Sequence, residues 1–290
     1  MNRKKFIKNS LSTAGILAAG GMGSDLFSEA KPARPELEPV GFNHLPISKN
    51  HFMENRILHP ADSRGLANHG WLKSHHSFSF ASYYNPERMH FGVLRVLNDD
   101  TVSPGMGFGT HPHDNMEIIS IPLEGDLEHK DSMGNTQVIR HGDIQVMSAG
   151  TGIYHSEYNR NKEKPVKFLQ IWVFPNQRNV TPRYYQITLN LKDRLNRFQQ
   201  ILSPSAEDEG VWIHQDAWFH LGKFDAGKKA TYSLKKKGNG VYAFLLSGKA
   251  SIDGQPLQAR DGFGLWNLEE FDFVAEAESE ILLMEVPMHI

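Results

Sequence analysis

Short stretches of alternating apolar and polar residues, separated by turns, run through the chain from about residue 57. The sequence SFSF at residues 77–80 alternates in this way, as a half-buried strand does. Glycine, asparagine and aspartate divide the stretches from one another, as expected of turns. Short strands with a turn signal about every eight to twelve residues predict an all-β sandwich or barrel rather than a parallel α/β sheet. Further strands are predicted over residues 91–97, 117–123, 144–147 and 168–173.

The same pattern recurs, more faintly, in the second half of the chain. Residues 241–247 form a predicted strand that ends at Gly248, as residues 117–124 form one that ends at Gly125. An internal repeat of this kind predicts two domains that share one architecture. We therefore expect two β-barrels in tandem, the first over residues 56–180 and the second over residues 181–290.

The N-terminal residues 1–30 have the layout of an export signal. A basic stretch at residues 3–8 is followed by a weakly apolar segment and by a small-residue cleavage sequence at residues 28–30. The basic stretch resembles a twin-arginine signal in which Lys4 replaces the second arginine. We expect export to the periplasm on this basis, with the cytoplasm as the alternative. The proline-rich residues 31–55 are predicted to be a linker.

Composition narrows the choice of chemistry and of partners. The chain has 290 residues and no cysteine, which excludes disulfides, thiolate metal sites and thiol catalysis. With 31 basic and 33 acidic residues, the net charge of −2 creates no field that attracts nucleic acid. No stretch after the N-terminus is long and apolar enough to insert stably into a membrane. We expect a monomer with neither nucleic acid nor membrane as a partner.

Two pairs of metal-binding side chains lie about forty residues apart, namely His111 with His113 and His155 with Glu157. Alternate side chains of a strand leave the same face, so each pair points one way. Two such pairs on facing strands bring three imidazoles and one carboxylate to a common centre. This donor set suits iron(II), manganese, nickel, copper or zinc. The alternative is that each histidine simply lies in a β-core or on the surface.

The second half of the chain lacks such a set of ligands. When the ligand spacing is projected from its turn glycines, Ala275 and Ala277 take the places of the second ligand pair. Leu234 and Lys236 take the places of the first pair. His214 and His220 also lie in this half, but nothing in the sequence pairs them into a site, and we expect both to be structural or surface residues. We therefore expect a second barrel without a metal.

The order of these motifs resembles the two sequence motifs of the cupin fold and, more narrowly, the pirin family of two-domain cupins. The resemblance covers about residues 56–287 and is densest up to residue 186. The stretches that carry it are RGLANHGWL at 64–72, SFSFA at 77–81, GFGTHPH at 107–113, LEG at 123–125, HKDSMG at 129–134 and MSAGTGIYHSE at 147–157.

The resemblance implies two jelly-roll cupin barrels with one metal, normally iron, in the first. The ligands of the family fall on His111, His113, His155 and Glu157. Glu117 stands where many other cupins carry a glutamate ligand, but this position is not a ligand in pirins. We therefore expect Glu117 to support the ligands from behind.

The resemblance also implies a reaction, because some bacterial pirins open the central ring of flavonols such as quercetin with dioxygen. In that reading Glu157 is the general base that accepts the proton of the substrate hydroxyl. His129 is expected to hold one of the imidazoles through a hydrogen bond. Apolar walls for an aromatic substrate are expected from Phe78, Phe80, Phe108 and Met147, although each of them also fits an ordinary barrel core.

Two other functions fit the same residues. Pirins of animal nuclei act as redox-sensitive transcription cofactors, so the chain is alternatively a non-enzymatic, metal-sensing regulatory protein that binds a protein partner. A zinc-dependent isomerase or lyase is a third reading, because cupin barrels host many reactions. Dioxygen-dependent turnover of quercetin separates the first function from the other two.

Overall fold

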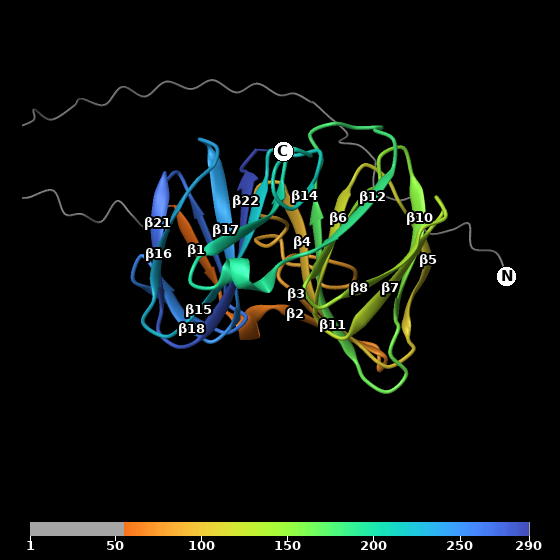
Figure 1. The fold of residues 1–290 in the computed structure, drawn as a ribbon, viewed down its shortest axis with the longest axis horizontal. Coiled ribbons are helices and arrows are strands. Elements are labelled where there is room, and N and C mark those ends of the chain that lie inside the picture. The colour runs from red at the N-terminus through yellow and green to blue at the C-terminus, as the bar shows by residue number, and fades with distance from the viewer. Residues whose placement is uncertain (1–54, 290) are drawn as a thin grey trace, which may run out of the picture. The chain divides into compact units, whose positions relative to one another are not determined.

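The structure of the chain, a computed structural model, describes residues 55–289 as strands joined by turns (Figure 1). The described residues include two short 3-10 helices, Ala61–Ser63 and Leu191–Arg194. No helix in this described part is long and apolar enough to cross a membrane. The predicted export signal and all but the last residue of the predicted linker lie outside the described residues, and both stay predictions.

The first barrel is formed by a four-stranded sheet and a seven-stranded sheet that face one another (Figure 1). The small sheet has the strand order β5-β10-β7-β8, and the large sheet has the order β12-β9-β6-β11-β4-β3-β2. The strands are β2 (Gly65–Asn68), β3 (Leu72–His76), β4 (Leu94–Val102), β5 (Gly107–His113), β6 (Glu117–Glu124), β7 (Asp126–Asp131), β8 (Thr136–Arg140), β9 (Asp143–Ser148), β10 (Ile153–Asn159), β11 (Val166–Val173) and β12 (Arg183–Thr188).

The second barrel repeats this arrangement, which confirms the predicted all-β fold of two tandem barrels. Its small sheet has the order β16-β21-β18-β19, and its large sheet has the order β1-β20-β17-β22-β15-β13-β14. The strands are β1 (Arg56–His59), β13 (Phe198–Ser203), β14 (Val211–Trp212), β15 (Trp218–Phe224), β16 (Lys229–Ser233), β17 (Asn239–Ser247), β18 (Lys249–Ile252), β19 (Gln255–Gln258), β20 (Gly262–Trp266), β21 (Glu270–Ala275) and β22 (Ser279–Pro287).

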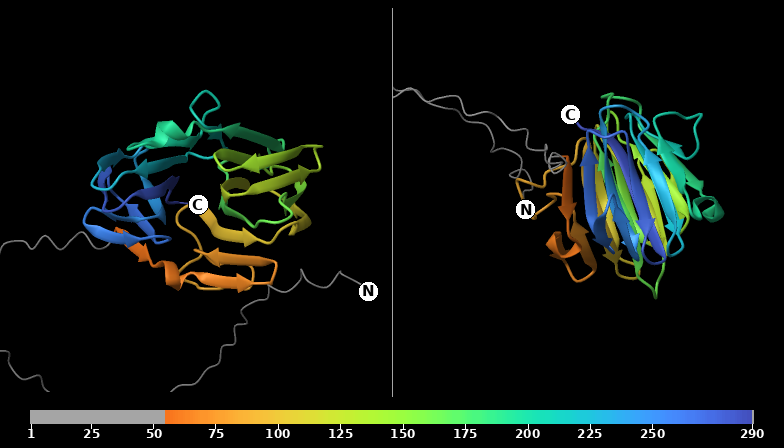
Figure 2. Two further views of the ribbon diagram at one scale, coloured as in Figure 1. Left: turned by 60° about the horizontal axis from the view of Figure 1, so that its bottom comes forward. Right: turned by 90° about the vertical axis from the view of Figure 1, so that its left-hand side faces the viewer.

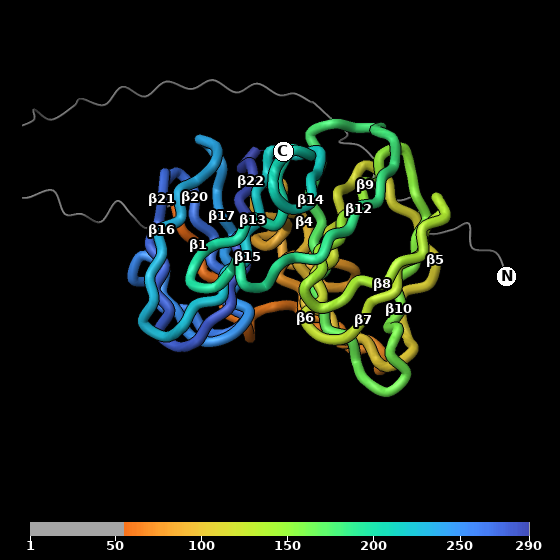
Figure 3. Tube along the Cα trace, in the orientation of Figure 1, coloured from red at the N-terminus to blue at the C-terminus, as the bar shows by residue number. Residues whose placement is uncertain are grey.

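The two barrels do not divide at residue 180, where the sequence placed the boundary. Strand β1, at the start of the described chain, pairs with β20 of the second barrel. Strand β12, which follows residue 180, pairs with β9 of the first barrel before the chain continues into β13 (Figure 3). Each large sheet therefore contains a strand from the other side of the predicted boundary, because hydrogen-bond pairing and not chain order decides which sheet a strand joins.

The outer faces of the two large sheets pack against each other and form the largest apolar core. In Figures 1 and 2 the large sheets lie between the two small sheets. The first barrel contributes Ile119 and Leu169 to this core, and the second contributes Phe219, Phe244 and Leu282, all fully buried. Strands covered on both faces need no polar side, which explains the nearly continuous apolar runs of β6, β11, β17 and β22.

The two barrels share one irregularity that gives the repeat its register. In β6 the pairing with β11 skips Leu123, and in β17 the pairing with β22 skips Leu246. A glycine with positive φ follows two residues later in each barrel, with φ of 79° at Gly125 and 83° at Gly248. A Cβ atom on Gly248 would lie 2.1 Å from a backbone carbonyl oxygen, so this turn requires glycine.

When the two barrels are aligned at Gly125 and Gly248, the ligand positions of the first barrel fall on different residues of the second barrel from those expected. Ile252 corresponds to His129, and Phe273 pairs with Ile252 as Glu157 pairs with His129. The places of His155 and Glu157 are thus held by Phe271 and Phe273, not by the alanines at 275 and 277. Tyr232, which pairs with Phe271, stands in the place of His111. Two phenylalanines cannot bind a metal, so the second barrel lacks the ligand set.

The core between the barrels should make them unfold together. Phe219→Ala removes a fully buried ring from this core and should lower the free energy of unfolding by about 3–5 kcal/mol. In urea titrations, near-UV and far-UV circular dichroism should report one transition that shifts as a whole. The control Leu66→Ala, at a side chain that is 59% exposed, should change the stability by less than about 0.5 kcal/mol. Two transitions, of which only one shifts, would contradict coupling through this core.

Candidate metal centre

Strands β5 and β10 pair antiparallel, and their register brings the predicted ligands to one face. His155 lies opposite His111, whereas Glu157 lies opposite Phe108. The single residue between His155 and Glu157 in β10 therefore faces the two residues between Phe108 and His111 in β5. This bulge adds a residue to β5 and keeps Phe108, His111 and His113 on the same side of the sheet. The predicted alternation within each ligand pair therefore holds in the structure.

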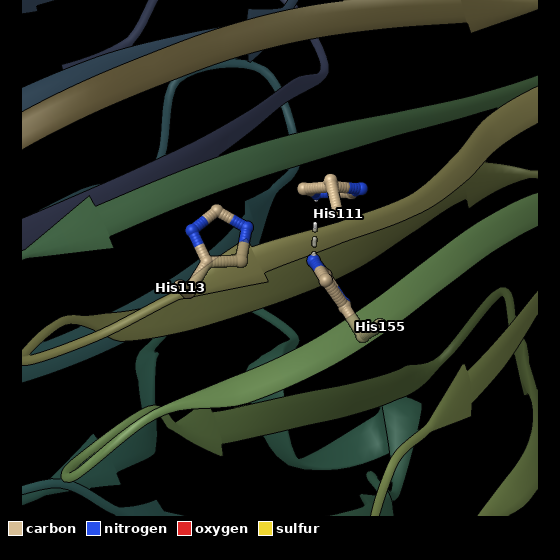
Figure 4. A group of neighbouring side chains, drawn as sticks. All are labelled: His111, His113 and His155. Carbon is tan, nitrogen blue, oxygen red and sulfur yellow. Dashed lines mark hydrogen bonds between the residues drawn. The ribbon is translucent and has the colours of Figure 1, made fainter. Parts of the chain in front are cut away.

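Three imidazoles gather at this face (Figure 4). His111 and His113 extend from β5, and His155 extends toward them from β10 (Figure 4). One nitrogen from each ring lies within 4.8 Å of the other two, and the Nε2 atoms of His111 and His155 are 3.0 Å apart. Two nitrogens bound at right angles about 2.1 Å from one ion lie about 3.0 Å apart, so this separation fits a shared cation.

The protonation of the rings also fits a metal. The Nδ1 of His111 lies 2.8 Å from the Gly109 carbonyl oxygen, to which it donates, and this leaves Nε2 free to bind a metal. His113 has a buried Nε2 without a hydrogen-bond partner. Burial, and then the neighbouring His111, lower the pKa of His113 to about 4 and that of His155 to about 2. At neutral pH these imidazoles are therefore uncharged, as metal ligands must be.

Glu157 lies behind the three imidazoles. Its buried carboxylate accepts hydrogen bonds from Ser120 Oγ at 3.1 Å and from Gln170 Nε2 at 2.6 Å. It lies within 4.8 Å of the ligand atoms of His155 and His129, and so forms a second group that shares His155 with the first. Burial raises the pKa of Glu157 to about 7 although both hydrogen bonds oppose the shift. The four predicted ligands thus form two overlapping groups rather than a single one.

His129 stands beside His155, where the sequence analysis expected a supporting residue. The Nδ1 atoms of the two rings are 3.5 Å apart, and His129 Nε2 lies 3.2 Å from the carboxylate of Asp131. The ring of Tyr184 lies against His129 with centroids 4.7 Å apart. These contacts fix the plane of the His129 ring next to the cluster.

Glu117 points away from the cluster, contrary to the sequence interpretation. On β6 the side chain of Ser120 faces the barrel interior, where it reaches Glu157. Glu117 is three positions earlier and lies on the opposite face. There its carboxylate accepts a hydrogen bond of 2.7 Å from Ser148 and lies near the guanidinium of Arg183. Its place is in the contact between the barrels, and it does not support the predicted ligands.

Phe78 is likewise removed from the expected wall of the site. Its ring is fully buried in the core between the barrels, 5.2 Å from the ring of Tyr242. The alternation of polar and apolar residues at 77–80 predicts that Phe78 and Phe80 lie on the same face of a strand. It does not show where the segment bends. The two rings therefore end in different places.

The other three predicted wall residues do lie close to the cluster. Phe80 packs against Trp172 at 5.3 Å, and Trp172 in turn lies edge-on to His113 at 4.9 Å. Met147 is buried in an apolar group with Trp172 and with Ile153, the residue opposite His113. Phe108 lies opposite Glu157 and packs against Trp71 at 5.3 Å.

Sequence reasoning missed Ser120, Gln170 and Trp172. Ser120 and Gln170 are the polar residues at the centre of the strands EIISIPLE and VKFLQIWV, whose charged residues lie at or near the strand ends. A polar side chain at the centre of a fully buried strand requires a partner, and that was the available signal. No comparable signal marks Trp172, because an aromatic residue in a strand is ordinary.

Comparison with known proteins places the chain among related sequences. The family profile described as Pirin matches residues 59–173, and the profile described as Quercetinase C-terminal cupin domain matches residues 200–286. A protein of Escherichia coli K12 named quercetin 2,3-dioxygenase is 41% identical over 230 residues, which are 79% of this chain and 98% of that protein. A Pseudomonas aeruginosa protein named putative quercetin 2,3-dioxygenase is 43% identical over 230 residues, which are 78% of this chain and 97% of that protein.

Solved structures share the fold as well. A crystal structure of a bacterial pirin from Escherichia coli in complex with nickel(II) superimposes with a TM-score of 0.76 at 40% sequence identity. The match covers 80% of this chain and 99% of that chain. The two barrels described above are therefore cupin domains in tandem, and the imidazole cluster lies in the one that matches the Pirin profile.

The imidazole cluster predicts which substitution removes a bound metal. His155→Ala deletes the ring shared by both ligand groups and should lower the metal affinity by more than about tenfold. Elemental analysis of the purified variant should show this loss. The matched control His141→Ala changes an exposed histidine and should leave the metal content unchanged. Full occupancy in His155→Ala would place the metal elsewhere.

The pKa of Glu157 predicts a pH dependence of metal binding. Below its pKa of about 7 the carboxyl group is protonated and must release a proton to act as a ligand. The apparent metal affinity should therefore rise with pH and level off above 7, and it should be about tenfold lower at pH 6 than at pH 8. Glu157→Gln should remove this dependence in metal titrations followed by calorimetry. A slope that survives in Glu157→Gln would assign the proton to another group.

Proposed function

Because the chain belongs to the pirin family, we propose that it is a metal-dependent dioxygenase that opens the central ring of flavonols such as quercetin. The observation that carries this proposal is the cluster of three imidazoles in the Pirin-matching barrel, two of which, His113 and His155, are uncharged at neutral pH. Two of the relatives carry the name quercetin 2,3-dioxygenase or its putative form at about the same identity, which supports the same reaction class.

The metal in this proposal is held by His111, His113 and His155, which form one group. We propose Glu157, which is grouped with His155 but not with His111 or His113, as the fourth ligand. We propose iron(II), the metal that the family resemblance implies, while nickel, manganese, copper and zinc suit the same donors. The related bacterial pirin was crystallised with nickel(II), which supports a divalent ion for this donor set. When bound, the ion lowers the pKa of a substrate hydroxyl and favours its ionised form.

Glu157 would leave the ion to act as the general base of the proposed reaction. Its raised pKa of about 7 matches the working pH, so it can both accept and return a proton. It takes the proton of the flavonol 3-hydroxyl, and the resulting electron-rich ring reacts with dioxygen. Both oxygen atoms enter the opened product, and one ring carbon leaves as carbon monoxide. Ser120 and Gln170 hold the carboxylate in position through their hydrogen bonds to its two oxygens.

An aromatic substrate also needs apolar surface near the imidazoles. Phe80 and Trp172 provide two rings in contact with each other, and Trp172 contacts His113. Phe108 lies opposite Glu157 on β5, and Met147 lies in the apolar group beside Trp172. We propose that these four side chains line the substrate site, whereas Phe78 does not.

Oxygen uptake in the presence of quercetin tests the proposal. The metal-loaded protein should consume dioxygen and bleach quercetin, and His113→Ala should abolish both. Glu157→Gln should keep the ion on the three histidines but lower kcat by about 100-fold or more. Phe80→Leu should raise KM several-fold, while the matched control Phe78→Leu should leave KM unchanged.

The absence of oxygen uptake with every one of the five metals would contradict the enzyme. Partner binding that changes with the oxidation state of the metal, without turnover, would instead favour the metal-sensing regulatory function. Turnover by the zinc form without dioxygen would favour an isomerase or lyase.

A further inference from the structure

The second barrel contains a cavity of about 670 Å³ that no step of the proposed reaction uses. Its lining includes Phe198 on β13 and both Trp218 and His220 on β15. Trp218 and His220 are two positions apart on one strand, so both project into the same side. Cavities of about 300–1,000 Å³ are the size of small-molecule sites. Here Phe198 and Trp218 supply the apolar part of a lining that is otherwise polar or charged.

His220 is held in this cavity by two buried groups. Its Nδ1 lies 3.3 Å from the Tyr232 hydroxyl, and that hydroxyl donates to Glu285 Oε2 at 2.8 Å. The Glu285 carboxylate is fully buried and also accepts from the backbone N–H groups of residues 235 and 236 and from the side-chain amide of Asn239. Because the carboxylate oxygens accept hydrogen bonds and have no hydrogen to donate, the tyrosine hydroxyl is the donor and its proton lies toward Glu285.

This arrangement leaves one nitrogen of His220 without a partner. The Tyr232 oxygen donates to Glu285 and can only accept from His220, so the proton of the imidazole lies on Nδ1. Nε2 is then a bare acceptor, and it makes no hydrogen bond to any described residue. His220 is only 4% exposed, and it lines the cavity. Burial and the nearby Lys235 lower the pKa of His220 to about 3, so the ring remains uncharged.

The rim of the cavity favours no ion of either sign. Arg197 is paired with Asp193 at 2.9 Å, and the basic Lys235 and the acidic Asp208 and Glu209 also line the cavity. Charges of both signs thus lie around Phe198 and Trp218, and the lining as a whole favours neither a strong anion nor a strong cation. The ligand that fits is therefore neutral and flat, and it carries a donor for one imidazole nitrogen.

We propose that this cavity is a second small-molecule site and that it binds a neutral phenol. The phenol hydroxyl donates to His220 Nε2, and its ring lies against Trp218. The position of Tyr232, which stands where the first barrel has His111, explains why a hydrogen-bonding site occurs here instead of a metal ligand. This site is independent of the reaction proposed for the first barrel.

Calorimetric titration of the full chain with phenol, and with anisole as the matched ligand, tests the site. Anisole has the same ring but a methyl group in place of the donor hydrogen, so phenol should bind several-fold to about tenfold more tightly. The comparison is repeated in His113→Ala, where the imidazole cluster of the first barrel is incomplete. Phenol binding should persist there with a stoichiometry of one.

Three substitutions in the second barrel locate the binding. His220→Phe should abolish the preference for phenol over anisole, and Trp218→Leu should weaken both ligands to a similar degree. His214→Phe, at a half-buried histidine away from this cavity, should change neither affinity. If His220→Phe fails to fold, the phenol and anisole comparison on the unsubstituted chain decides.

Four outcomes would overturn the site. They are equal binding of phenol and anisole, phenol binding that survives both His220→Phe and Trp218→Leu, loss of binding in His113→Ala, and absence of saturable binding in the millimolar range. A shift of the His220 imidazole nitrogen resonances on addition of phenol but not of anisole would support it directly.

Discussion

The antiparallel pairing of β5 with β10, with its single bulge, is the constraint on which the imidazole cluster depends. It sets His111 opposite His155 and leaves Phe108 opposite Glu157 on the same face. A regular ladder would require Phe108 and His111, which are an odd number of residues apart, to face opposite sides. The bulge thus allows one strand to supply both metal-binding nitrogens and an apolar ring to the interior of the first barrel.

Strand alternation was sufficient to predict the three imidazoles, because each ligand pair is separated by one residue within a strand. It did not predict on which face of the sheet Glu117 lies. A shift of one residue in the register of a strand moves all of its side chains to the opposite face. The projection into the second barrel failed for a similar reason. The residue that corresponds to Asp143 is Asp261. Each aspartate accepts a hydrogen bond from the backbone N–H of the residue three positions before it. The segment from Asp261 to Phe271 is two residues shorter than the segment from Asp143 to His155, so the spacing of the first barrel could not be projected onto the second.

The interiors of the two barrels differ in polarity although their strands share one register. Ser120, Gln170 and Glu157 fill part of the first interior with hydrogen-bonded polar groups. At two of the same positions the second barrel has Leu283 for Gln170 and Phe273 for Glu157, both fully buried. A cluster of its buried polar groups lies at one end, around Glu285. The same framework therefore supports a polar centre in one half and an apolar interior with a polar end in the other.

The exchange of β1 and β12 between the halves has a consequence for dissecting the protein. A cut at residue 180 would strip β20 and β9 of their outer neighbours and leave the backbone N–H and C=O groups of both strands facing water. Exposed edges of this kind recruit strands from other molecules, so isolated halves should be prone to aggregate. Expression of either barrel alone calls for a fragment that keeps its borrowed strand, supplied in the same polypeptide or as an added peptide.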